Sequence, residues 1–123
     1  MSPASFVNQL ANNAGVPAND PDRATAISRF GSATDTTDVV ARGRALRDIA
    51  ENATVFQQEK NRAFVLMQYF GYLRRNPNDP QDTDYAGYEF WLNKLNAANG
   101  DYVAAEMVKA FLGSTEYNRR FAP

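Results

Sequence analysis

One acidic stretch, residues 78–84, contains closely spaced polar side chains that could bind a metal ion. It reads Asn-Asp-Pro-Gln-Asp-Thr-Asp. Protein-bound calcium takes about six to eight oxygen ligands, commonly from carboxylates on a tight loop. The stretch could supply oxygens from Asn78, Asp79, Asp82 and Asp84. The glycine turn and distal glutamate of a helix–loop–helix calcium site are absent at the required spacing. We therefore expect turn and helix-capping roles for these side chains, with calcium binding as the alternative.

Most familiar catalytic systems are excluded by composition. The chain has no histidine and no cysteine, which removes Ser-His-Asp and Cys-His nucleophiles, disulfides and most zinc sites. No phosphate-binding glycine loop is present. A glycosidase-like carboxylate pair is formally possible, but among 14 acidic residues some pair must lie close by chance. We expect a protein that is not an enzyme and that carries no resident cofactor.

The second candidate site is aromatic and lies on a predicted helix over 85–96. Helical spacing places one group of residues on a common face, with Trp91 at its border: Tyr85, Tyr88, Leu92 and Leu95. Because successive residues of a helix are rotated by about 100° around its axis, Phe90 points almost opposite to this face. It therefore needs a second partner, which is either the other half of the domain or a binding partner. In the latter case Phe90 and Tyr85 form a protein-binding patch or a platform for a surface glycan.

Helical spacing dominates the whole chain, and no segment shows sustained strand alternation. Asp20 is expected to cap a helix at Pro21, Thr36 or Thr37 to cap the next, and Asn52 to cap a long one. The expected helices cover about 3–13, 21–30, 40–49, 53–75, 85–96, 102–112 and 114–121. The apolar stripe of the long helix is expected to comprise Phe56, Ala63, Phe64, Met67 and Phe70.

These patterns predict an all-α fold, a compact bundle of six or seven short helices around the long helix 53–75. We expect a single domain with an N-terminal half, 1–52, and a C-terminal half, 53–123. The pairs Phe6-Val7 and Phe64-Val65 each open a segment that is followed by an Asn-Asp-Pro turn. This echo is consistent with a duplicated helical unit; chance similarity between helical hairpins is the alternative.

The net charge and the length of the longest apolar run argue against two classes of partner, nucleic acids and membranes. The net charge is −1, from 13 basic and 14 acidic residues, so the basic excess of a nucleic-acid-binding protein is missing. The longest apolar run, 63–67, is far shorter than the ~20 residues that span a bilayer. We expect no nucleic-acid partner and no membrane insertion. The adjacent Arg74 and Arg75 are interpreted as charges that complement a helix C-terminus.

The C-terminal half resembles a known family. Residues 85–95, Tyr-Ala-Gly-Tyr-Glu-Phe-Trp-Leu-Asn-Lys-Leu, and the closing segment 111–121 resemble the bacterial domain-of-unknown-function family number 4214. The resemblance covers 63–121, with a fainter echo in the first half, and extends distantly to the phycobilisome linker domain. It implies a helical interaction module appended to a larger secreted or surface-associated bacterial protein. It carries over no catalytic residues, and the loop 74–83 is longer than the family's usual turn.

Overall fold

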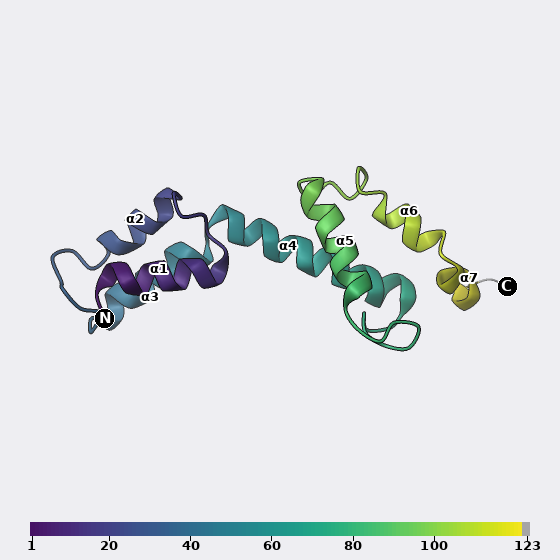
Figure 1. Cartoon of the computed structure of the whole chain (residues 1–123), viewed down its shortest axis with the longest axis horizontal. Coiled ribbons are helices and arrows are strands. Elements are labelled where there is room, and N and C mark those ends of the chain that lie inside the picture. Colours follow the sequence, from purple (N-terminus) through teal and green to yellow (C-terminus); the bar gives the residue numbers. More distant parts are fainter. Residues whose placement is uncertain (122–123) are drawn as a thin grey trace. The chain divides into compact units, whose positions relative to one another are not determined.

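The computed structural model describes residues 1–121. Every regular element in this range is a helix, which confirms the all-α prediction (Figure 1). The chain groups into two compact units, residues 1–57 and 58–123. The sequence placed the boundary of its two halves after residue 52, whereas the units meet within helix α4 (Ala53–Gln68).

The first unit contains α1 (Pro3–Ala14), α2 (Pro21–Ser28) and α3 (Val39–Ala50). The predicted start of α2 is confirmed, because Oδ1 of Asp20 accepts a hydrogen bond from the N–H of Asp22 at 2.9 Å. The predicted cap of α3 is wrong. Its cap is Asp38, which accepts from the N–H groups of the next turn, while the Thr37 hydroxyl donates to Asp35 instead.

The core of the first unit lies where α1, α2 and α3 meet. Its buried apolar residues are Val7, Ala11, Val16, Ala26, Phe30, Ala41, Ala45 and Ile49. One charged side chain is buried beside them. Arg23 donates from Nε to the carbonyl of Pro17 at 2.8 Å, and from Nη2 to Oδ1 of Asn12 at 2.8 Å. This guanidinium joins α1, the connecting loop and α2.

Helix α4 starts where the sequence predicted. Oδ1 of Asn52 accepts from the N–H of Thr54 at 3.0 Å and caps the helix. The expected single helix over 53–75 is α-helical only to Gln68 and continues as the π-helical turn η1 (Tyr69–Leu73). Arg74 then adopts a left-handed backbone with φ 55°, which ends the helical path.

The buried face of α4 differs from the predicted stripe. Asn61, Val65 and Gln68 are buried, whereas Phe56 and Met67 are 66% and 64% exposed. Phe70, in η1, is also exposed. The helical periodicity of a sequence shows that an apolar stripe exists, but it does not show which side of the helix is covered by other helices. Here two buried amide side chains occupy positions that apolar spacing alone does not identify.

The second unit contains η1, α5 (Ala86–Ala97), α6 (Met107–Leu112) and α7 (Thr115–Phe121). Its core consists of Val65, Tyr69, Leu73, Leu95, Ala105, Met107 and Phe111. The helix expected over 102–112 is shorter, because residues 102–106 form turns and Glu106 has φ 54°. Oδ1 of Asp101 accepts from the N–H of Val103 at 2.9 Å and holds this turn, whereas the residue that precedes α6 is Glu106.

Candidate functional site

A buried arginine organises the second unit. The π-helical turn and the left-handed Arg74 direct the Arg75 side chain inward, where only 7% of it is exposed. Its Nε donates to Oε1 of Glu116 at 2.5 Å, and its Nη2 donates to Oε2 at 3.1 Å. This is the bidentate arrangement that a planar guanidinium favours. It links the end of η1 to α7 across 41 positions of sequence.

The remaining donors of Arg75 hold the loop that follows it. Nη2 also donates to Oδ2 of Asp82 at 2.7 Å. Nη1 donates to the carbonyls of Asn76 at 3.1 Å and Pro77 at 3.3 Å. All five N–H bonds of the guanidinium therefore have protein acceptors. Hydrogen bonding to Glu116 raises the pKa of Arg75 above its usual value, with burial acting in the opposite direction.

The acidic loop does not gather its carboxylates into one group. Oδ2 of Asp79 accepts from the N–H of Asn76 at 2.8 Å, and Oδ1 of Asp84 accepts from the N–H of Ala86 at 2.9 Å. Asp82 pairs with Arg75, and Asn78 is exposed. Within residues 1–121, no group of three or more acidic side chains is placed to hold a metal ion. Asp79 thus acts in a turn and Asp84 at the start of a helix.

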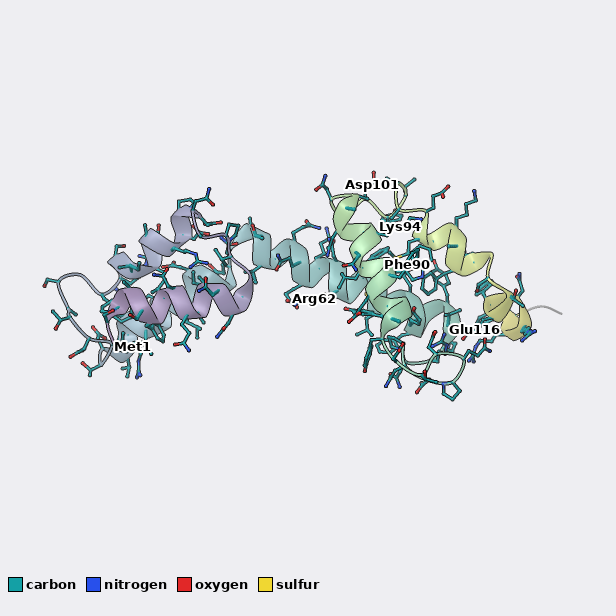
Figure 2. The ribbon with its side chains drawn as sticks, viewed as in Figure 1. Met1, Arg62, Phe90, Lys94, Asp101 and Glu116 are labelled. Atoms are coloured by element: carbon teal, nitrogen blue, oxygen red, sulfur yellow. The ribbon has the colours of Figure 1, made fainter. Side chains whose placement is uncertain are left out.

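Asp82 reaches a cavity beside Arg75. The cavity has a volume of about 250 Å³ and lies between η1, α5, α6 and α7. Its ionised side chains come from the arginine network, with Glu116 labelled in Figure 2. Its walls are formed by Tyr69, Leu73, Arg75, Asp82, Gly87, Trp91, Ala110, Phe111, Ser114 and Glu116. The cavity therefore combines ionised groups on one wall with aromatic rings on another.

Tyr69 places a hydroxyl in this cavity. The residue is only 3% exposed, and its ring meets Phe111 edge-on with centroids 5.2 Å apart. Gly87 leaves room for the hydroxyl, because a Cβ at that position would lie 2.9 Å from it. Burial and the neighbouring Asp82 carboxylate raise the pKa of Tyr69, so the phenol stays protonated near neutral pH.

The second predicted site, on α5, is largely exposed. Phe90 is 58% exposed, and its ring meets the Trp91 ring edge-on at a centroid distance of 5.0 Å. Lys94, labelled with Phe90 in Figure 2, holds its Nζ 5.3 Å from the Trp91 ring centroid. Tyr85, expected on the core side, is exposed and meets Tyr88 edge-on. Only Leu95 of that predicted face is fully buried.

A shallow hollow extends this aromatic surface towards α6. It has a volume of about 250 Å³ and is lined by Trp91, Lys94, Glu106, Lys109, Ala110 and Gly113. Trp91 and Ala110 line both this hollow and the cavity beside Arg75. The α5 surface, defined here as Phe90, Trp91 and Lys94, therefore borders two depressions. Sequence analysis identified Phe90 but not Lys94.

Sequence analysis missed Arg75 and Glu116. Arg75 was interpreted as a charge at a helix end, and Glu116 was only part of the closing segment. The guanidinium meets Glu116 and Asp82 through tertiary contacts, so no local spacing predicts the network. The one available signal was the length of the 74–83 loop, which needs an internal anchor for its carbonyl groups.

Comparisons of the chain with protein-family models, with curated proteins and with solved structures found no match. Across residues 1–121, none of the helices has the length and apolar character needed to cross a membrane.

Proposed function

We propose that this chain is a noncatalytic protein-interaction or structural module that binds through the α5 surface. The observation that carries the proposal is the exposure of Phe90, 58%, on a helix whose other large apolar side chains are at least partly covered by their own unit. Exposing a phenylalanine costs free energy unless a partner covers it. Aromatic residues are also enriched at protein interfaces.

The chemistry of the α5 surface favours a protein as its partner. Phe90 and Trp91 give an aromatic centre, and Lys94 gives a charged edge beside it. An apolar centre with a polar rim is the usual layout of a binding patch. The partner is another copy of this chain or a second protein that offers an apolar side chain to Phe90.

The setting of the module is part of the same proposal. The resemblance to family 4214 supports attachment to a larger secreted or surface-associated bacterial protein. In that setting a helical module without catalytic residues would connect its parent protein to a neighbour. The alternative function, binding of calcium or a surface glycan by the acidic loop and nearby aromatics, has less support because Asp79, Asp82 and Asp84 each have separate partners.

The test compares two matched truncations, Phe90→Ala in the second unit and Phe56→Ala in the first. Both side chains are exposed, 58% and 66%, so neither change should cost more than about 0.5 kcal/mol of folding free energy. Sedimentation velocity over a concentration series measures self-association. We expect Phe90→Ala to weaken association about tenfold or more, as loss of an interface anchor does, and Phe56→Ala to leave it unchanged.

Two outcomes would contradict parts of this proposal. If Phe90→Ala lowers the melting temperature strongly, Phe90 belongs to the core and the α5 surface is not free. If the wild-type chain stays monomeric at high concentration, the partner is not a second copy. Affinity capture from bacterial surface fractions, run in parallel with wild type and Phe90→Ala, then tests for a different protein that depends on Phe90.

A further inference from the structure

The cavity beside Arg75 contains free hydrogen-bond acceptors, whereas every donor of the Arg75 guanidinium is already bonded. Every N–H of Arg75 already meets a protein oxygen, on Glu116, Asp82 or the loop carbonyls. Oδ1 of Asp82, by contrast, has no hydrogen-bond donor within residues 1–121. An anion entering this cavity would find no free guanidinium N–H and would face two carboxylates. The ligand must therefore be a donor.

Tyr69 contributes a second available acceptor to the cavity. Its hydroxyl lines the cavity, the residue is only 3% exposed, and the hydroxyl makes no hydrogen bond to any described residue. Within residues 1–121 the buried side-chain atom without a partner is Oε1 of Gln68, so the Tyr69 hydroxyl is open to solvent and to a ligand. Gly87 keeps the space in front of the hydroxyl open. A donor placed there would reach the Tyr69 oxygen and the free oxygen of Asp82.

The charges on the wall favour a cation. Arg75 contributes one positive charge, and Asp82 and Glu116 contribute one negative charge each, so the lining has a net charge of −1. Arg120 approaches Glu116 at 3.9 Å, but it is not part of the lining and its side chain is 41% exposed. Solvent screens such an exposed charge. Lys94 borders the neighbouring hollow and does not line this cavity.

The aromatic walls and the size of the cavity fit a small cationic group. Rings of Tyr69, Trp91 and Phe111 line the cavity, and aromatic rings attract cations through their quadrupoles. A volume of about 250 Å³ lies below the usual range for a drug-sized ligand. Trp91 offers little free ring for a stacked sugar, since Phe90, Phe111 and Lys94 all approach it.

We infer that this cavity binds a primary alkylammonium group. The ammonium donates to the hydroxyl oxygen of Tyr69 and to Oδ1 of Asp82, and the alkyl chain lies against Trp91 and Phe111. The same chemistry has two sources, the side chain of a lysine in a partner protein or a small free amine. The inference does not depend on Phe90, so its failure would leave the proposed function of the α5 surface intact.

The fluorescence of Trp91 reports ligand binding directly, because Trp91 is the single tryptophan of the chain and lines the cavity. The intact chain is titrated with n-butylammonium, with 1-butanol as the uncharged analogue, and with butyrate as the anion, at constant ionic strength. We expect saturable emission changes with n-butylammonium at millimolar concentrations, and none with butanol or butyrate. N-acetyl-lysine methylamide, titrated in the same way, presents the lysine side chain in a peptide setting.

Three variants locate the binding. Tyr69→Phe removes one hydrogen bond and should weaken n-butylammonium binding about fivefold. Asp82→Asn removes the charge and should weaken it about tenfold or more. Glu89→Gln removes one negative charge from an exposed position of α5 outside the cavity and should leave binding unchanged. Melting curves verify that each variant folds. If Asp82→Asn does not fold, the n-butylammonium affinity of Tyr69→Phe still tests the site.

Each outcome either supports or overturns the inference. Tighter binding of the lysine derivative than of n-butylammonium supports a partner lysine, and the reverse order supports a free amine. Equal binding of butanol, saturation by a neutral monosaccharide alone, or unchanged affinity in Tyr69→Phe would overturn the ammonium site. Absence of any saturable change with either amine would overturn it as well.

Discussion

The hydroxyl of Tyr69 lies 2.9 Å from the place where a side chain at Gly87 would begin. The Tyr69 ring cannot move aside easily, because it is buried and packs edge-on against Phe111. The absence of a Cβ at Gly87 is therefore what lets η1 approach α5 at this point.

Gly87→Ala should destabilise the second unit. Overpacking costs about 1–3 kcal/mol, which exceeds the gain of about 1 kcal/mol that alanine brings to a helix. Urea unfolding measures the change, with Trp91 fluorescence reporting the second unit and far-UV circular dichroism reporting both units. Adding Tyr69→Phe should remove most of the cost by deleting the clashing oxygen. Gly43→Ala in α3 is the control, because nothing lies within 4 Å of its Cβ position; it should stabilise the first unit by about 0.5–1 kcal/mol. Equal effects of both substitutions would contradict the role of the contact.

Arg75→Met should unfold the second unit far more readily than a change at its neighbour. The substitution leaves Glu116, whose side chain is 13% exposed, without its principal cation. Removing one member of such a buried pair costs about 3–5 kcal/mol. Arg74→Lys is the control, since Arg74 is exposed and only lies over the Phe121 ring at 5.9 Å. Denaturation monitored at Trp91 should separate the two variants clearly, and similar midpoints would show that the Arg75 network is dispensable.

Asp48 should give the first unit an acid-sensitive stability component. The hydrogen bond from Arg29, at 2.8 Å, lowers the pKa of Asp48. A carboxyl whose folded pKa is depressed stabilises the fold above its unfolded pKa of about 3.9. That contribution is lost as the pH falls through the folded value. Melting followed by far-UV circular dichroism should show wild type losing more stability than Asp48→Asn between neutral and strongly acidic pH. Parallel curves for the two proteins would refute this assignment.

Calcium should leave the melting temperature unchanged. The carboxylates of Asp79, Asp82 and Asp84 serve a turn, Arg75 and the start of α5, respectively. Gathering them around one ion would break these contacts. Melting in EDTA and then in about 1 mM calcium, a concentration suited to extracellular calcium modules, provides the measurement. A clear rise in melting temperature would instead make these aspartates ligands and revive the calcium hypothesis.

The helical class and most helix starts can be predicted from local sequence patterns. Asp20 with Pro21 and Asn52 act as predicted because a cap depends on a side chain two or three residues from the N–H groups it satisfies. The cap of α3 was missed by one position, since Thr37 and Asp38 are both competent caps and Asp35 engages the threonine.

The tertiary structure decided which faces are covered and where the charges meet. Phe56 and Met67 belong to a regular apolar stripe yet remain exposed, while Asn61 and Gln68 are buried. The cavity depends on Arg75 reaching Glu116, and on Tyr69 facing Gly87. Such pairs are brought together by the packing of η1, α5 and α7. The helical periodicity of a sequence contains no information about contacts between residues that lie far apart along the chain. The exposed position of Phe90 was open to two interpretations in the sequence, and the packing of α5 left its ring largely in solvent.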